Sequence, residues 1–149
     1  SSAASDVYKR QAVLQALGDL NTPPTNFNSV LSGNADATDI KTIDAANGAG
    51  SINGSSLNQI NGSAANVVAA LNALITQPAN FDTTLVDAVP TSAQDIIEIA
   101  AANGSGSIDG NALSDIKGTL AQVNEALGDL VITLPGTFNV ELTDAPPFH

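Results

Sequence analysis

Two glycine-rich runs carry the residue types and spacing that come nearest to an ion-binding loop. They are NGAGSING at 47–54 and NGSGSIDG at 103–110, and they place Gly and Ile as in the calcium loop of an EF-hand. Oxygen ligands are needed there at loop positions 1, 5 and 12. Those positions hold Ala45, Ala49 and Ser56 in the first run and Ala101, Ser105 and Ala112 in the second. Without carboxylates an EF-hand site is excluded, and both runs are predicted to be turns whose glycines allow positive φ.

Three aspartates and one histidine are the other candidates for chemistry. Asp109 alone resembles the aspartate of the tandem Gly-Gly-x-Gly-x-Asp calcium repeat, whose other residues are missing here. Asp87 and Asp144 stand at equivalent positions after a strand-like segment, where they either bind an ion between units or cap the next turn. We favour capping. His149 is the single histidine and the last residue, so a Ser-His-Asp triad would rest on a frayed terminus.

The remaining patterns do not form a catalytic or cofactor site. The Gly-x-Gly runs at 48–50 and 104–106 follow helix-like segments and lack the third glycine of a dinucleotide fingerprint. Distinctive residues occur twice at a fixed spacing, whereas an enzyme needs one unique constellation. We therefore predict that the chain is not an enzyme and has no catalytic, cofactor-binding or metal-ligating residues, with calcium binding kept as an open alternative.

Charge and composition exclude several partners. The chain has 149 residues, a formal net charge of −11 and only four Lys and Arg residues, so clustered phosphate contacts to nucleic acid are excluded. No apolar run reaches the roughly 20 residues of a membrane span, which predicts no membrane insertion. The absence of Cys excludes disulfides and thiolate metal sites. Aromatic residues make up 3%, so the core must be built from Ala, Val, Ile and Leu.

An internal duplication is the strongest signal in the sequence. The window 39–74 aligns without gaps with the window 95–130, and 19 of its 36 positions are identical. The repeat is thus about 56 residues long. Phe81 and Leu85 recur as Phe138 and Leu142, shifted by one residue from this period. We therefore expect residues 12–149 to form a single array of about two and a half copies, truncated at both ends.

A half-period inside the duplication predicts the fold. Apolar residues recur about every 28 residues, and helices are expected around them over 12–20, 36–46, 64–75, 92–102 and 119–130. Alternating residues predict strands near 81–85 and 138–142. The fold class is therefore predicted to be α/β, a repeat solenoid of about 28-residue strand–helix units with one parallel sheet and one helical layer. An all-α repeat, in which the Gly-rich runs are loops, is the alternative.

Residues 1–11 differ from the rest of the chain. SSAASDVYKRQ holds the single Tyr and two of the four basic residues. It resembles a translated sequencing-adapter sequence, and a natural disordered tail is the alternative. Neither interpretation gives this segment a function.

The repeat itself resembles a known kind of sequence. Its pattern is D-I-x-x-I-x-A-A-N-G-x-G-S-I-[ND]-G followed by L-x-x-I-x-G-[ST]. This is similar to the degenerate tandem repeats of very long acidic proteins of marine bacteria and cyanobacteria. The resemblance implies a structural or spacer segment of a large secreted or cell-surface protein, adhesin-like and extracellular, with neighbouring repeats as its partners. A glycan- or calcium-binding repeat module, engaging surface glycans, is the alternative function.

Overall fold

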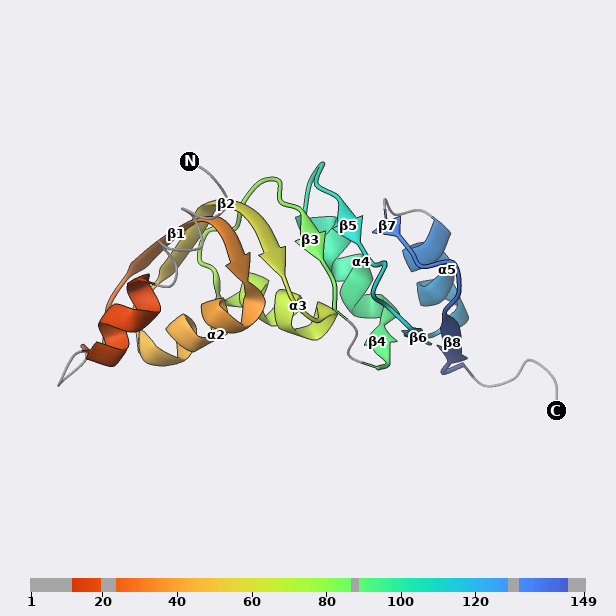
Figure 1. The fold of residues 1–149 in the computed structure, drawn as a ribbon, viewed down its shortest axis with the longest axis horizontal. Coiled ribbons are helices and arrows are strands. Elements are labelled where there is room, and N and C mark those ends of the chain that lie inside the picture. Colours follow the sequence, from red (N-terminus) through yellow and green to blue (C-terminus); the bar gives the residue numbers. More distant parts are fainter. Residues whose placement is uncertain (1–11, 20–23, 87–88, 129–131, 145–149) are drawn as a thin grey trace.

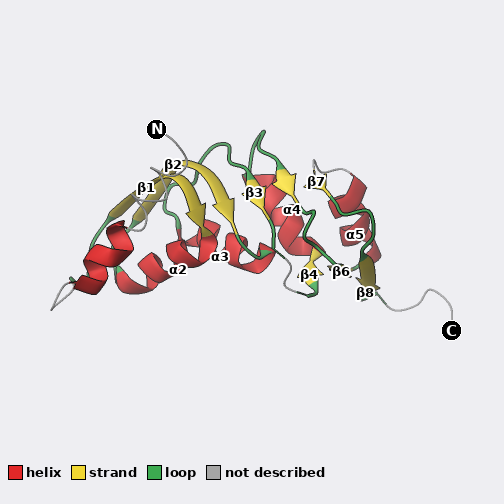
Figure 2. Cartoon of the chain, viewed as in Figure 1, coloured by secondary structure: helices red, strands yellow, loops and turns green. Residues whose placement is uncertain are grey.

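The computed structural model describes residues 12–19, 24–86, 89–128 and 132–144. Helices alternate with parallel strands along the chain, so the protein is mixed α/β and the all-α alternative is wrong. Figure 1 shows an elongated molecule in which the chain advances along the long axis from β1 to β8. In Figure 2 the helices follow one another in chain order beside the strands.

Five helical segments are present where the apolar spacing predicts them. A helix covers 12–19, and the others are α2 (Ala37–Ala46), α3 (Ala64–Ala73), α4 (Ala93–Ala102) and α5 (Leu120–Gly128). The third helix ends earlier than predicted, at Ala73 instead of position 75. Leu74 leaves the helical conformation, and the backbone N–H of Ile75 then donates to the carbonyl of Ile52 on a strand. Strand pairing thus replaces the last helical bonds there.

Hydroxyl side chains cap three of these helices. Ser63 and Ser92 accept backbone N–H groups at the starts of α3 and α4. Before α5, the Thr119 hydroxyl accepts from the N–H of Gln122 at 3.2 Å, and the Gln122 side-chain oxygen accepts from the N–H of Thr119 at 2.9 Å. This reciprocal pair is a capping box, which satisfies two otherwise unpaired N–H groups.

The strands form three parallel sheets in the described residues, rather than the single sheet predicted. One sheet contains β1 (Ser29–Asp36) and β2 (Ile52–Asn61). The others have the orders β3-β5-β7 and β4-β6-β8. Their bounds are β3 Thr83–Thr84, β4 Thr91–Ser92, β5 Ile108–Asp109, β6 Asp115–Gly118, β7 Ile132–Thr133 and β8 Asn139–Leu142.

Short interruptions separate the sheets. Between β5 and β6 the Asp109 side chain accepts from the N–H of Asn111 at 3.0 Å, whereas the equivalent bond from Ser55 to Asn53 accompanies a register shift and leaves β2 continuous. Isolated parallel bridges still join β2 to the next segment, at Asn53 with Thr76, Gln59 with Asp82 and Gly62 with Leu85. Each extended segment therefore lies beside the extended segment that follows it in the chain.

Neighbouring strands and neighbouring helices repeat at different sequence separations. The helix starts set a unit of about 28 residues, from Ala37, Ala64, Ala93 and Leu120. Paired strand residues are closer together in the sequence than this unit, as in Ser29 with Ile52 and Thr83 with Ile108. The described residues of the segment 76–92 pair with β2 and its following residue Gly62 on one side and with β5 and β6 on the other.

Small side chains allow the helices to approach the strands closely. The first residues of α2, α3 and α4 are Ala37, Ala64 and Ala93, and all three are buried. A Cβ on Gly118 would lie 2.9 Å from the Cβ of Ala93, so this strand end has no room for a side chain. The core between the layers is built from Ile, Leu, Val and Ala, with Phe81 as its one fully buried aromatic among the described residues. No helix in the described ranges is long and apolar enough to cross a membrane.

Candidate functional site

The glycine-rich runs are fastened to the preceding extended segment by side chains that flank a phenylalanine. In the first case Asn26 accepts from the backbone N–H of Ala49 at 2.8 Å. Asn28 accepts from both the N–H and the hydroxyl of Ser51, at 2.8 and 3.1 Å. We call this arrangement a turn clip. It holds the turn after α2 to the segment that leads into β1.

A second turn clip repeats the geometry one duplication later. Asn80 accepts from the N–H and the hydroxyl of Ser105 at 2.8 and 2.9 Å. Asp82 accepts from the N–H and the hydroxyl of Ser107 at 2.7 and 3.0 Å. The backbone N–H of Phe81 also donates to the Asn103 carbonyl at 3.2 Å. Backbone N–H and hydroxyl groups of both glycine-rich runs thus bond the preceding extended segment. The side-chain oxygen of Asn47 is buried without a hydrogen-bond partner among the described residues.

The glycines of these runs are required by the close approach of the two segments. Gly48 and Gly104 have φ of 58° and 61°, where side chains are strained. A Cβ on Gly50 would lie 1.7 Å from the carbonyl oxygen of Phe27, and one on Gly106 would lie 1.8 Å from that of Phe81. The prediction that both runs are turns with positive φ is confirmed.

Buried asparagines complete each turn from inside. The side-chain amide of Asn47 donates to the Gly50 carbonyl at 2.9 Å, and that of Asn103 donates to the Gly106 carbonyl at 2.8 Å. Both asparagines are almost fully buried. Their own backbone N–H groups bond the carbonyls of Ile43 and Ile99, which ends α2 and α4. One residue therefore both terminates a helix and shapes the turn that follows.

The aspartates singled out in the sequence serve as hydrogen-bond acceptors. Asp144 accepts from the N–H of Leu120, the first residue of α5, at 2.5 Å. It thus caps a helix that precedes it in the chain, rather than the next turn as predicted. Asp109 bonds Asn111 and accepts from the Thr133 hydroxyl at 3.3 Å. Asp87 and His149 lie outside the described residues.

Hydrogen bonding and burial shift two carboxylates in opposite directions. The N–H and hydroxyl of Ser107 lower the pKa of Asp82 below its usual value, because both bonds favour the ionised form. Burial, with a smaller contribution from the nearby Glu98, raises the pKa of Asp95 on α4. In the ranges that the structure covers, no group of three or more His, Cys, Asp or Glu side chains is arranged to hold a metal ion.

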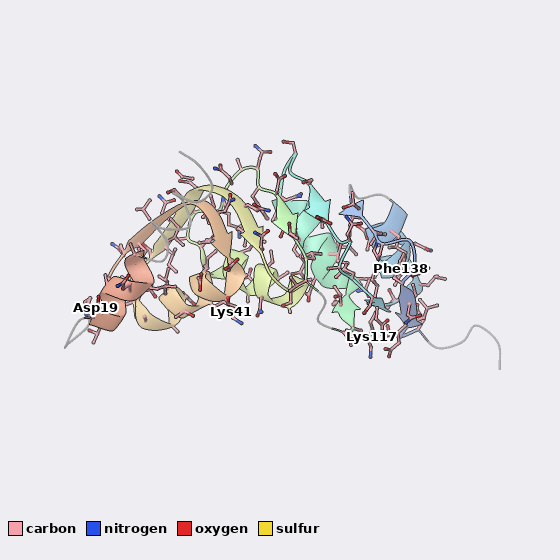
Figure 3. The ribbon with its side chains drawn as sticks, in the orientation of Figure 1. Asp19, Lys41, Lys117 and Phe138 are labelled. Atoms are coloured by element: carbon pink, nitrogen blue, oxygen red, sulfur yellow. The ribbon has the colours of Figure 1, made fainter. Side chains whose placement is uncertain are left out.

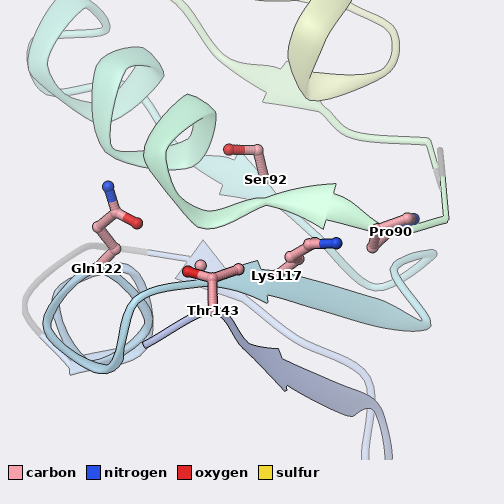
Figure 4. A pocket seen from close by; sticks show the side chains of 6 residues that line it. Pro90, Ser92, Lys117, Gln122 and Thr143 are labelled. Atoms are coloured by element: carbon pink, nitrogen blue, oxygen red, sulfur yellow. The ribbon is translucent and has the colours of Figure 1, made fainter. Parts of the chain in front are cut away.

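Three hollows lie beside these elements, and one of about 360 Å³ is lined by residues that include Leu17, Phe27 and Asn28. A groove of about 220 Å³ is lined by polar groups of the second turn clip, Asn80, Asp82 and Ser105, together with Asn58 on β2. Figure 4 shows another, of about 280 Å³, between Pro90 and the start of α5. Its one charged residue, Lys117, pairs with Glu141 at 2.8 Å, so its charge is already compensated.

Positive charge is not gathered anywhere in the described part of the chain. Figure 3 shows Lys41 on α2 and Lys117 on β6 at opposite parts of the molecule. The Lys41 ammonium donates to the Asn66 side chain at 2.8 Å. This arrangement offers no surface on which several phosphate groups would find cations together.

The turn clips were missed in the sequence, although a signal for them is present. Asn-Phe-Asn at 26–28 and Asn-Phe-Asp at 80–82 repeat the same pattern, with a phenylalanine between two short acceptor side chains. Each precedes a Gly-x-Gly-Ser turn, at 48–51 and at 104–107 respectively. Comparison of the chain with protein-family models, curated proteins and solved structures found no match.

Proposed function

We propose that this chain is a structural spacer segment of a large secreted or cell-surface protein, adhesin-like and not an enzyme. In this proposal its strand–helix units of about 28 residues stack as an α/β solenoid. The observation that carries the proposal is the pair of turn clips. In both, a short polar side chain and a serine of a glycine-rich run hold one segment to the next.

The recurrence of the same contacts supports a repeat array. The contact between Asn28 and Ser51 recurs between Asp82 and Ser107. The phenylalanine beside each contact belongs to the core or packs against it: Phe81 is buried in the core, and Phe27 is partly buried and packs against it. In a spacer each unit needs only its two neighbours, so such contacts recur and no unique cluster is required. Neighbouring repeats are therefore the proposed partners, with an extracellular or cell-surface location.

A glycan-binding module is the second candidate function. The groove beside the second turn clip presents amide, carboxylate and hydroxyl groups from Asn58, Asn80, Asp82 and Ser105. Such groups bond the hydroxyls of a sugar ring. Its volume of about 220 Å³ is below the usual range for small-molecule sites, which favours the spacer.

The proposed function is tested by small-angle X-ray scattering together with ligand screening. A spacer gives an elongated particle in solution and shows no saturable binding to calcium or to a glycan array. Saturable glycan binding that Asn58→Ala abolishes, and that the exposed α5 control Asn124→Ala leaves intact, would establish the glycan module instead. Turnover of any substrate in a hydrolase panel would reject the non-enzymatic assignment.

A further inference from the structure

The outer edge of β8 is a strand edge without a neighbour among the described residues. β8 is the last strand in the order β4-β6-β8, and all four of its residues are exposed. Its inner edge pairs with β6, from Asp115 with Asn139 to Gly118 with Leu142. The outward backbone groups of a parallel edge strand are a template for one more strand.

The sequence around β8 repeats a segment that does have such a neighbour. Phe138 and Asn139 are the counterparts, in the next copy of the repeat, of Phe81 and Asp82 at the centre of the second turn clip. Asn139 therefore occupies the place of the clip acceptor that bonds Ser107 in one copy and Ser51 in the other. Within the described ranges, no N–H or hydroxyl group donates to the Asn139 side chain.

The exposed fractions of side chains on β8 also indicate that a neighbouring strand is missing from the described residues. Thr83 and Leu85 are 1% and 0% exposed because β5 and the layers around it cover them. Their counterparts in the next copy, Val140 and Leu142, are 45% and 50% exposed. Two apolar side chains at core positions thus lie uncovered beside an unfilled clip acceptor.

We propose that the β8 edge is a docking surface for one further turn and strand of the kind formed by residues 47–61, joined in series to this chain. The inference rests on the spacer function proposed above. Asn139 accepts the N–H and hydroxyl of the incoming serine, as Asn28 does from Ser51. The incoming strand pairs with β8 in the register of β1 with β2, which covers Val140.

Two features select this occupant. A second whole copy of the chain cannot supply the turn, because both of its Gly-x-Gly-Ser turns are already held by its own turn clips. If the incoming strand pairs with β8 as β2 pairs with β1, Glu141 takes the place of Val30 and faces the incoming residue that corresponds to Asn53. An asparagine there avoids the like-charge contact that Asp109 of the other turn would make. The β2 type of unit is therefore the better fit.

The test adds the missing neighbour. Residues 37–92 are appended after residue 149, where the spacing of the duplication continues, and Asn139→Ala is made in both the original and the extended chain. We expect the extended chain to melt in one transition at a higher Tm than the original. Asn139→Ala lowers the Tm of the extended chain by about 2–4 °C and leaves the original unchanged. Asn124→Ala, on the exposed side of α5, is the matched control and changes neither.

Hydrogen exchange supplies a readout at the edge itself. The amides of β8 that face outward become protected in the extended chain and lose that protection with Asn139→Ala. Equal Tm losses in both chains, or two separate melting transitions, overturn the docking proposal. A dimer of the original chain that Asn139→Ala dissociates overturns it too, because the occupant is then a second copy. Substrate turnover or glycan binding would reject the spacer function and leave this result standing.

Discussion

Gly106→Ala is the substitution with the most direct structural consequence. A methyl group at this position would lie 1.8 Å from the carbonyl oxygen of Phe81 and 2.4 Å from its carbonyl carbon. Both atoms are backbone, so no side chain can rotate away. Reaching even a tight contact of 3.0 Å requires a separation of the two segments by about 1.2 Å, the difference between 3.0 and 1.8 Å.

That separation breaks contacts whose contribution can be estimated. The bonds from Phe81 N–H to Asn103 and from Ser107 N–H to Asp82 are 3.2 and 2.7 Å long and cannot both survive it. Each contributes about 1 kcal/mol. Displacing Phe81, which is 2% exposed, adds an overpacking cost of about 1–3 kcal/mol. The free energy of unfolding should therefore fall by roughly 3–5 kcal/mol, a large share of the stability of an ordinary domain.

The assay is urea unfolding followed by far-ultraviolet circular dichroism, since the chain has no Trp. Gly136→Ala is the matched control, because a Cβ at that position meets no atom within 4 Å. We expect the control to unfold within about 1 kcal/mol of the original chain. A loss below about 1 kcal/mol for Gly106→Ala, or equal losses for both variants, would refute the close approach of the two segments.

Other parts of the same structure give three further expectations. Asp82→Asn keeps a hydrogen-bond acceptor, as Asn28 does, but removes a titrating group. Because folding lowers the pKa of Asp82, the ionised carboxylate adds stability at pH values above the unfolded pKa of about 4. This stability is lost as the pH falls through the folded pKa. The original chain should thus lose stability relative to Asp82→Asn in acid urea titrations, and parallel curves would contradict this. Thr119→Ala opens the capping box before α5 and should lower the free energy of unfolding by about 1 kcal/mol in the same assay, with Thr38→Ala, at an exposed position of α2, as control. Millimolar calcium should leave Tm unchanged, and a rise that chelator reverses would show a calcium site.

The helices could be predicted because their signal is local. Apolar residues repeat by three and four within each helix, and Ser63, Ser92 and Thr119 mark three of the starts. The end of α3 was not predictable in this way. Leu74 is apolar and continues the helical spacing. The backbone N–H of Ile75, however, donates to the carbonyl of Ile52, which precedes the whole of α3 in the sequence.

The sheets and the turn clips required information that a repeat pattern does not contain. The period of the helices suggested one parallel sheet, whereas the strands pair at a shorter sequence separation than this period and divide into three sheets. The repeated Asn-Phe-Asn and Asn-Phe-Asp patterns mark the turn-clip residues but do not identify their partners. Their role depends on the carbonyl of Phe81 lying against Gly106, which only the three-dimensional arrangement reveals.

The advance of the chain along one axis has a mechanical consequence. A pull that separates β1 from β8 runs along the long axis seen in Figure 1, across most strands rather than along them. The bonds that join adjacent segments are then loaded a few at a time, and rupture proceeds from an end inward. Each freed unit of about 28 residues would lengthen the chain by about 90–100 Å. Extension in many small steps absorbs work gradually, which suits a tether more than a rigid strut.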